Sequence, residues 1–326
     1  MKTVLVNSFN KFFSSQKKEY LRQKRKGLND RIQFYNWWGE PIKDSWLYKF
    51  TENSGLLTNS QKQISFCSVF GSRKVLYFVA TDAKVFFSGE NLHNPGYSEY
   101  ADALLGDNEC DLSLGFDCFE DDRYMRFPLW LMYMFSPSID VGQIKQRCMQ
   151  LRYPQQQNER KRFASLIARY DTSGLRTEIY NVLSQIGRVD CPSQVLHNDE
   201  SLHIDYKDNK TEYLKRYKFN VCPENSNSYG YVTEKVFEAI ASGCVPVYRG
   251  SYNMPEPGIL NPDAIVFWDK QDGGSSAAKT VGELYSDENY YRDFASQPRL
   301  LDTAEGKVEE MIIGLYDRLK EIINNI

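Results

Sequence analysis

The sequence predicts a two-domain α/β protein with parallel sheets, and three observations support this fold class. Short apolar runs alternate with segments of helical periodicity, which is typical of parallel sheets covered by helices on both faces. The chain has 326 residues, too many for one ordinary core and enough for two such domains. A polar stretch without periodicity, residues 155–160, lies between the two halves. We therefore place the domain boundary close to it, between residues 150 and 151.

The first domain, residues 1–150, is expected to begin with a polar, basic segment and to continue as an α/β series. The apolar runs predict strands at residues 31–39, 64–69, 75–79, 85–88 and 112–116. Helices are expected at residues 45–51, 98–105 and 126–135. Residues 1–30 are interpreted as a solvated helix or arm because of their cations, which include Lys17, Lys18, Arg22, Lys24, Arg25 and Lys26.

The second domain, residues 151–326, repeats the alternation of strands and helices. Strands are predicted at residues 163–170, 217–221, 244–248 and 264–268. Helices are predicted at residues 175–186 and 234–242, the second of them ended by Gly243. From Ala304 onwards, an amphipathic helix is predicted by an apolar face of Val308, Met311, Ile312, Leu315, Leu319, Ile322 and Ile323.

Composition excludes several classes of protein. A hydrophobic fraction of 41% and a charged fraction of 25% are typical of soluble globular chains. The net charge of -3 argues against a general nucleic-acid binder. No stretch approaches the roughly 20 apolar residues that span a bilayer, and the seven cysteines show no C-x-x-C spacing. We expect reduced thiols and a cytoplasmic location, with weak contact of residues 17–26 with the inner membrane surface as a less favoured addition.

The sequence offers no pattern for a bound metal. The three histidines, His93, His197 and His203, form no H-E-x-x-H or similar arrangement. No D-x-D triplet occurs, so the usual sign of a metal held by paired carboxylates around a diphosphate is missing. We therefore expect a site without metal or cofactor.

The most informative stretch is residues 217–250, which reads as strand, polar loop, helix and second strand. Thr233 occupies the expected N-cap, and Glu234 and Lys235 fall in the first helical turn. A loop between a strand and a helix N-terminus faces the ligand side of an α/β sheet, where free N–H groups attract anions. A lysine at that end opposes the helix dipole unless a negative ligand is bound.

This cluster has two interpretations. Singly, Lys235 is best explained as a solvated surface lysine and Glu234 as an acid that complements the helix dipole. Together with Glu224, Asn225 and Tyr231 in one loop, they favour a site for a polyphosphate and a ribose. The acid would accept hydrogen bonds from ribose hydroxyls, and the lysine would neutralise phosphate oxygens.

A second candidate is Glu90, which follows the predicted strand at residues 85–88 through a turn at Gly89. Ligand chemistry concentrates at the carboxyl ends of such strands, and an apolar lead-in can raise the pKa of an acid by desolvation. Taken alone, Glu90 is better explained as a turn carboxylate that caps the next segment.

Three blocks of sequence carry a family resemblance. Residues 83–91, residues 122–128 and the YKFN…ENS…YGYVTEK block at residues 217–235 resemble the family 10 α-1,3/4-fucosyltransferases. They are most similar to its bacterial lipopolysaccharide-modifying members. Residues 175–181 resemble the Arg-containing helix of the same family.

The resemblance implies a fold, a reaction and roles for single residues. The fold would be GT-B, with two Rossmann-like domains facing a cleft: an N-terminal acceptor-binding domain and a C-terminal GDP-fucose-binding domain with a terminal helix. The reaction would be inverting α-1,3 transfer of L-fucose from GDP-β-L-fucose to a GlcNAc/Glc-containing oligosaccharide, in protein glycosylation or lipopolysaccharide biosynthesis, without an essential metal. By resemblance, Glu90 is the general base, Glu234 binds the ribose, and Arg176 and Lys235 bind the diphosphate. Asn225 and Tyr231 would lie near the nucleotide, and Glu224 matches the acid of the ENS block.

Two alternatives remain open at this point. One keeps the GT-B architecture but changes the donor to another nucleotide sugar, because the loop residues do not identify the base. The other is a non-catalytic protein that binds a glycan or a sugar nucleotide, which the joint presence of Glu90, Arg176, Glu234 and Lys235 disfavours.

Overall fold

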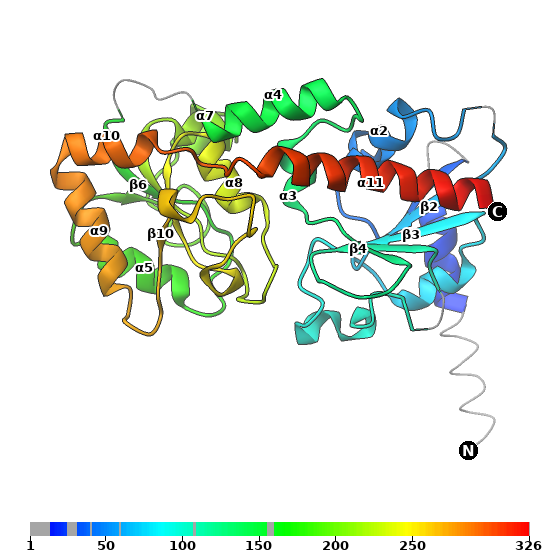
Figure 1. Cartoon of the computed structure of the whole chain (residues 1–326). Coiled ribbons are helices and arrows are strands. Elements are labelled where there is room, and N and C mark those ends of the chain that lie inside the picture. The colour runs from blue at the N-terminus through cyan, green and yellow to red at the C-terminus, as the bar shows by residue number, and fades with distance from the viewer. Residues whose placement is uncertain are drawn as a thin grey trace, which may run out of the picture. The chain divides into compact units, whose positions relative to one another are not determined.

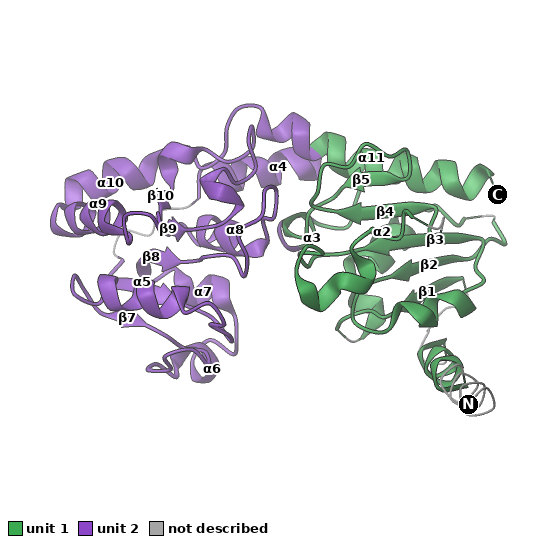
Figure 2. Cartoon of the chain, turned by 90° about the horizontal axis from the view of Figure 1, so that it is seen from below, with its two compact units in different colours: residues 1–132, 136–140, 309–326 green, residues 133–135, 141–308 purple. Residues whose placement is uncertain are grey.

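The computed structural model describes residues 14–24, 31–39, 41–58, 60–106, 109–154 and 160–325 (Figure 1). Figure 2 shows two compact units, which comprise residues 1–132, 136–140 and 309–326 (unit 1) and residues 133–135 and 141–308 (unit 2). The division falls at residue 140 and not at residue 150, because helix α4 (Val141–Arg152) contacts helix α8 (Glu234–Ala241) of unit 2. The terminal helix α11 (Ala304–Asn325), expected with the second domain, contributes its residues from 309 onwards to unit 1.

Unit 1 contains a five-stranded parallel sheet in which the strands follow one another in chain order. Ile32 pairs with Ile64, and Val85 pairs with Leu112. The strands are β1 (Ile32–Tyr35), β2 (Ile64–Cys67), β3 (Ala83–Phe87), β4 (Leu112–Gly115) and β5 (Tyr124–Arg126). The helices α2 (Trp46–Asn53) and α3 (Trp130–Met134) agree with the expected helical segments. Because β3 lies between β2 and β4, the residues after Phe87 emerge at the middle of the sheet edge.

Two predictions for unit 1 were wrong. Residues 75–79 were expected as a strand but lie in and after the 3-10 helix η2 (Arg73–Phe78), whose Ser72 cap accepts a hydrogen bond from the Lys74 amide. Val75 and Leu76 are both buried, as in a buried strand, but the Val75 and Val79 amides donate to the Ser72 and Leu76 carbonyls and so close local turns. Residues 98–105 were expected as an α-helix but form the end of the 3-10 helix η3 (Pro95–Tyr100) and then turns.

Unit 2 contains a second five-stranded parallel sheet, in the order β10-β9-β8-β6-β7. Its strands are β6 (Arg162–Leu166), β7 (Val189–Asp190), β8 (Tyr217–Val221), β9 (Val245–Tyr248) and β10 (Val266–Phe267). Besides α4 and α8, its helices are α5 (Leu175–Leu183), α6 (Ser201–Ile204), α7 (Lys210–Leu214), α9 (Ser275–Ser286) and α10 (Glu288–Ser296). The central strand β8 is buried at every position, so the polar loop that follows it is anchored in the middle of the sheet.

The helical and terminal predictions for the rest of the chain are largely confirmed. The apolar face of α11 is buried at Ala304, Val308, Ile312, Leu315, Leu319 and Ile323. Residues 14–24 are helical, and the side chains of Lys17, Lys18, Arg22 and Lys24 are exposed. Arg25 and Lys26 lie outside the described residues. All seven cysteines are free thiols, and Cys118 alone among them is exposed. In the described part of the chain, no helix combines the length and the apolar character needed to cross a bilayer.

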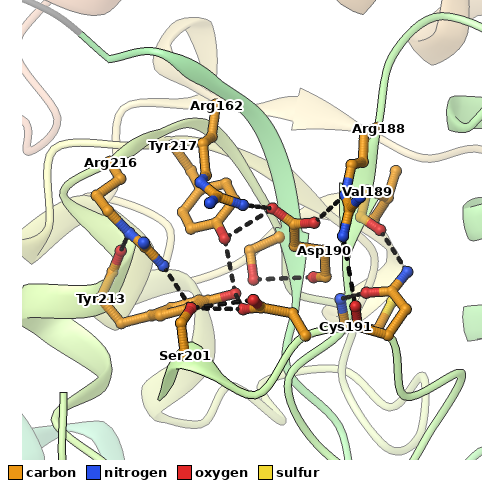
Figure 3. A network of polar contacts seen from close by, with 12 residues as sticks. Arg162, Arg188, Val189, Asp190, Cys191, Ser201, Tyr213, Arg216 and Tyr217 are labelled. Atoms are coloured by element: carbon orange, nitrogen blue, oxygen red, sulfur yellow. Dashed lines mark hydrogen bonds and ion pairs between the residues drawn. The ribbon is translucent and has the colours of Figure 1, made fainter. Parts of the chain in front are cut away.

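A buried carboxylate, Asp190, joins the strands at one end of the unit 2 sheet (Figure 3). It accepts hydrogen bonds from Arg162 (2.6 Å), Arg188 (2.6 Å) and the Tyr217 hydroxyl (2.9 Å). The Tyr217 oxygen lies 2.7 Å from the hydroxyl of Tyr213, on α7. Burial alone would raise the pKa of Asp190, but the hydrogen bonds from Arg188, Arg162 and Tyr217 outweigh it and lower the pKa. This network fixes β6, β7, β8 and α7 relative to one another.

The lowered pKa of Asp190 predicts a pH-dependent contribution to stability. The contribution is fully present above the pKa of an unfolded aspartate, about 3.9, and is lost as the pH falls through the lower folded pKa. Asp190→Asn should therefore reduce the free energy of unfolding at pH 7 by about 1–3 kcal/mol, because Arg162 and Arg188 are partly exposed and screened by water.

Urea unfolding of the wild type and of Asp190→Asn between pH 7 and pH 3 measures this difference, with the exposed Asp205→Asn as the matched control. The difference should stay constant down to about pH 4.5 and narrow below about pH 4. A difference that is absent at pH 7, or that grows in acid, would contradict the account.

Candidate active site

The residues predicted to bind a nucleotide converge at the carboxyl edge of the unit 2 sheet. Strand β8 ends at Val221, and the loop that follows leads to helix α8, which begins at Glu234 after Thr233 in extended conformation. Arg176 is the second residue of α5. Two helix N-termini therefore meet beside one strand end, which is where parallel α/β sheets bind anionic ligands. Thr233 occupies the N-cap as predicted, but its side chain makes no cap hydrogen bond.

Glu224 is the buried centre of this arrangement, with a fully covered side chain. Its carboxylate accepts hydrogen bonds from the Thr233 amide (2.8 Å) and the Thr233 hydroxyl (2.7 Å), and it forms an ion pair with Lys235 (3.2 Å). Its own amide donates to the Arg249 carbonyl. A Cβ atom at Gly250 would lie 2.6 Å from the Cγ atom of Glu224, so only glycine fits there. Glu224 thus ties the loop, the start of α8 and the turn after β9 together.

Lys235 and Glu234 are both charged in this environment. Burial would lower the pKa of Lys235, but the carboxylates of Glu224 and Glu234 raise it well above its usual value. Burial would raise the pKa of Glu234, but the charge of Lys235 lowers it. The Lys235 ammonium lies 2.7 Å from the Thr233 hydroxyl and 3.6 Å from the Glu234 carboxylate. The lysine is therefore held in place by acceptors and retains its charge.

Arg176 is a buried cation whose hydrogen bonds go to neutral oxygens. Its guanidinium donates to the carbonyls of Tyr170 (2.8 Å) and Pro223 (3.4 Å) and to the side-chain oxygen of Asn225 (2.9 Å). The Asp171 carboxylate accepts hydrogen bonds from the backbone amides of Arg176 and Thr177, in the first turn of α5. Burial lowers the pKa of Arg176. An anion at this position would supply the charge that the neutral partners do not.

Five of the six predicted nucleotide residues contact one another in two groups, Arg176 with Asn225 and Lys235 with Glu224 and Glu234. Asn225 is exposed and bonds Arg176, which agrees with a position beside a ligand. Glu224 contacts Lys235, and Lys235 contacts Glu234. Tyr231 is 2% exposed, so its ring presents little surface. The fully covered carboxylate of Glu224 is likewise better placed to hold other residues than to touch a ligand.

A strained turn borders the same loop. Ser251, Tyr252 and Asn253 in the 3-10 helix η4 (Ser251–Asn253) all have positive φ values, of 49°, 51° and 58°. Non-glycine residues rarely adopt this conformation, and strain of this kind concentrates at functional sites. The turn is bonded to the β8–α8 loop because the Ser251 hydroxyl accepts from the Gly230 amide (3.0 Å).

Three polar residues of this region were missed by the sequence analysis. Lys210, the first residue of α7, forms an ion pair with Glu238 (3.2 Å), and Asn220 projects from the buried strand β8. One signal was available, because Glu238 follows Glu234 by four residues and therefore lies on the same helix face. Lys210 is 28 positions away from Glu238 in sequence, and its pairing depends on the tertiary fold.

Glu90, the predicted base, lies at the carboxyl edge of the unit 1 sheet. It follows β3 after Ser88 and Gly89, and its amide donates to the Ser88 hydroxyl (3.2 Å). A Cβ atom at Gly89 would lie 3.0 Å from Leu129, so the turn leaves little room for a side chain. Glu90 is partly buried, and its charge adds to the effect of burial in raising the pKa of Tyr97.

Two other features of this edge were not anticipated. His93 lies 2.8 Å from the Asp117 carboxylate, just beyond β4. Trp37 and Trp38, which follow β1, are stacked at 4.4 Å between ring centroids, and Trp38 also contacts Phe70 and Phe87. Partly exposed aromatic rings at the sheet edge that also carries Glu90 are suited to contact a sugar ring. Among the described residues, no group of three or more His, Cys, Asp and Glu side chains is arranged to hold a metal.

These features define an α/β protein of two parallel-sheet units, one of which carries two cations, Arg176 and Lys235, at the carboxyl edge of its sheet. Solved structures share this architecture. A crystal structure of an α1,3-fucosyltransferase matches 90% of this chain and 91% of its own, with a TM-score of 0.63 and 25% identity. A structure of an α1,3-fucosyltransferase with GDP-fucose matches 89% of this chain and 90% of its own, with a TM-score of 0.57 and 23% identity. The expected GT-B fold class is thereby confirmed.

The sequence comparisons identify the family. The model of the α-(1,3)-fucosyltransferase FucT N-terminal domain matches residues 32–133, and that of the C-terminal part of glycosyltransferase family 10 (fucosyltransferase) matches residues 156–305. The chain therefore belongs to glycosyltransferase family 10. It is 28% identical over 312 residues to the α-(1,3)-fucosyltransferase FucT of Helicobacter pylori, a match that covers 85% of this chain and 61% of that protein. An α-(1,4)-fucosyltransferase of Arabidopsis thaliana is 32% identical over 81 residues, 25% of this chain and 20% of its own.

The buried position of Glu224 predicts a loss of stability on its neutralisation. Glu224→Gln keeps the shape but removes the charge that Lys235 and the Thr233 groups contact, so the free energy of unfolding should fall by about 1–3 kcal/mol. The exposed Glu283→Gln on α9 is the matched control and should change it by less than about 0.5 kcal/mol. Denaturant unfolding of both variants tests this, and equal stabilities would mean that the Glu224 carboxylate does not hold the loop.

Proposed function

We propose that this chain is a fucosyltransferase that moves L-fucose from GDP-fucose to a hydroxyl of an oligosaccharide acceptor. The observation that carries the proposal is the pair of cations, Arg176 and Lys235, at the carboxyl edge of the unit 2 sheet beside two helix N-termini. Family 10 membership supports the donor, and the α1,3-fucosyltransferase solved with GDP-fucose shares the fold. The match covers 61% of the length of the Helicobacter pylori relative. The activity and the substrates of this chain are therefore stated as proposals.

In the proposed complex, the diphosphate of the donor lies against the α8 and α5 N-termini. Lys235 is charged and held by Glu224 and Thr233, so it can bind phosphate oxygens without reorganising. Arg176, whose present partners are neutral oxygens, gains an anionic partner. Glu234 is ionised and accepts hydrogen bonds from the ribose hydroxyls. Glu224 acts as a positioning residue, while Asn225 and Tyr231 border the nucleotide.

The transfer is proposed to be a single displacement with inversion at the anomeric carbon. The acceptor oxygen forms a bond to the fucose carbon while the bond from that carbon to the β-phosphate oxygen breaks. Glu90 takes the acceptor proton as general base, and the leaving GDP carries the negative charge. Arg176 and Lys235 stabilise that charge electrostatically, a task that a divalent metal performs in other transferases. We therefore propose that no essential metal takes part.

The acceptor is proposed to bind at the unit 1 edge that carries Glu90. The stacked rings of Trp37 and Trp38 offer an apolar face to a sugar, and an N-acetyllactosamine-like glycan is the acceptor class that we favour. Donors based on another nucleotide remain the alternative.

Measuring GDP release and product formation in EDTA tests the proposed function. With GDP-fucose and N-acetyllactosamine, lactose or N-acetylglucosamine, we expect turnover with at least one acceptor and little gain from Mg²⁺ or Mn²⁺. Turnover with UDP-sugars but not with GDP-fucose would show that the proposed donor is wrong. A strict need for a divalent metal would contradict the two-cation mechanism.

The variant Glu90→Gln distinguishes two roles of Glu90, that of a general base and that of a residue that stabilises the turn. If Glu90 is the base, turnover should fall by roughly 10²- to 10⁴-fold while GDP affinity and melting temperature are retained. If Glu90 only stabilises the turn, melting temperature should fall and the folded fraction should keep its activity. Initial rates, calorimetric GDP affinity and thermal unfolding of the wild type and Glu90→Gln decide between these outcomes. The exposed Glu99→Gln in the same unit is the matched control.

A further inference from the structure

The helix at residues 14–24 is attached to unit 1 by two of its side chains. The ring of Tyr20 stacks on the ring of Tyr35, the last residue of β1, at 5.5 Å between centroids. One turn further along the helix, Gln23 is partly buried and contacts Asn36, the residue that follows β1. One side of this helix therefore packs against the carboxyl end of a strand, although the sequence predicted a solvated segment.

Gln23 and Asn36 form a reciprocal pair of hydrogen bonds. The Asn36 amide donates to the Gln23 side-chain oxygen (2.7 Å), and the Gln23 side-chain nitrogen donates to the Asn36 side-chain oxygen (3.2 Å). A backbone amide can only donate, so the orientation of the Gln23 amide group is fixed. The same nitrogen also donates to Glu19 (2.8 Å), one turn earlier on the helix. These contacts hold the Gln23 side chain in one position.

Asn36 adopts an uncommon backbone conformation that its contacts maintain. Its φ of 50° lies in the left-handed region, and the residue is 2% exposed. Its side-chain nitrogen donates to the Ser72 carbonyl (3.0 Å) and to the Tyr100 hydroxyl (2.9 Å), and its carbonyl accepts from the Phe70 amide (3.0 Å). Its amide and its side-chain oxygen are bonded to Gln23. Loss of the Gln23 amide group would take these partners from two buried polar groups.

The turn at Asn36 determines where the rings of Trp37 and Trp38 lie. Asn36 is the link between β1 and these two residues, so its φ and ψ set the direction in which the chain leaves the strand. The two rings are stacked, and Trp38 lies 5.6 Å from the ring of Phe87. Phe87 is the last residue of β3, the strand that leads to Glu90. A change at Asn36 would therefore move the rings relative to the strand that carries the proposed base.

We propose that Gln23 is a positioning residue of the acceptor site, which acts through Asn36 on the rings of Trp37 and Trp38. The inference rests on the proposed function, because it assumes that these rings contact the acceptor sugar. Gln23 itself touches no substrate. Its two hydrogen bonds to Asn36 hold the left-handed turn, so the rings are in place before the acceptor arrives. The helix at residues 14–24 lies before the part of the chain that the FucT N-terminal domain matches, and it thereby contributes to acceptor binding.

Quenching of tryptophan fluorescence by acrylamide tests the positioning without any turnover. Three of the five tryptophans are buried, namely Trp46, Trp130 and Trp268. The partly exposed Trp37 and Trp38 therefore dominate the quenching. Gln23→Met keeps the length of the side chain but makes neither hydrogen bond to Asn36, so the quenching constant should rise by about 1.5-fold or more. Lys18→Met, at an exposed position of the same helix, is the matched control and should be quenched as the wild type is.

Acceptor kinetics distinguish a positioning role from a purely structural one. They are measured with the best acceptor of the wild type among N-acetyllactosamine, lactose and N-acetylglucosamine. Gln23→Met should raise the KM for this acceptor roughly 10-fold, while kcat and GDP affinity stay within about twofold of the wild type. A residue that only stabilises the fold would instead lower the melting temperature and reduce kcat with the folded fraction, and KM would not change.

Unchanged quenching, or an unchanged acceptor KM, in folded Gln23→Met would overturn the inference and leave the proposed function intact. The placement of the acceptor is tested separately in the wild type, where a saturating acceptor should cover the rings and reduce quenching. Wild-type quenching that this acceptor does not reduce would contradict its placement on Trp37 and Trp38. Absence of turnover by the folded wild type with every acceptor would contradict the proposed function itself.

Discussion

The ion pair between Glu224 and Lys235 is the contact on which the unit 2 site depends. A carboxylate with no exposed surface is costly unless its oxygens are satisfied, and Thr233 and Lys235 together satisfy them. In return, Glu224 fixes where α8 begins and leaves room only for a glycine at position 250. The lysine is therefore held rigidly and fully charged at the N-terminus of a helix, a position that is unfavourable until an anion arrives. The ion pair of Glu224 and Lys235 therefore contributes both to the stability of the loop and to the proposed binding of an anion.

The two sheets place the remaining chemistry by a common rule. In both units the strands are parallel, so every loop that leaves a carboxyl end emerges at one edge. In unit 1 that edge carries Glu90, the His93–Asp117 pair and the stacked Trp37 and Trp38. In unit 2 it carries Arg176 and Lys235. The proposed division of labour, with acceptor chemistry on one unit and donor binding on the other, follows from which side chains each edge presents. The Asp190 network gives unit 2 the rigidity that such placement needs.

The sequence predicted those elements whose pattern is local. Strand β8 has the predicted bounds, and α8 and α11 were recognised by their apolar faces. The prediction was wrong at residues 75–79, where the amides of Val75 and Val79 bond to carbonyls three residues earlier and the chain forms a 3-10 helix. Strand β5 was missed because its three residues are only partly buried and give no apolar run. Resemblance located Arg176 and Lys235, but the ion pair of Lys210 with Glu238 depends on the fold, which brings α7 against α8. The burial of the Glu224 carboxylate could not be predicted from the sequence either, because it depends on residues of other segments.

The central claim is that the cations at the unit 2 edge bind the diphosphate of a nucleotide sugar, and Lys235 tests it most directly. Titration calorimetry of GDP should be made on the wild type, on Lys235→Ala and on Lys270→Ala, an exposed lysine of the same unit, after melting temperatures establish that each is folded. A charge-assisted contact to phosphate is about 1.5–3 kcal/mol, so Lys235→Ala should weaken GDP by roughly 10- to 100-fold. Lys270→Ala should bind as the wild type does. Unchanged GDP affinity in folded Lys235→Ala would contradict the account.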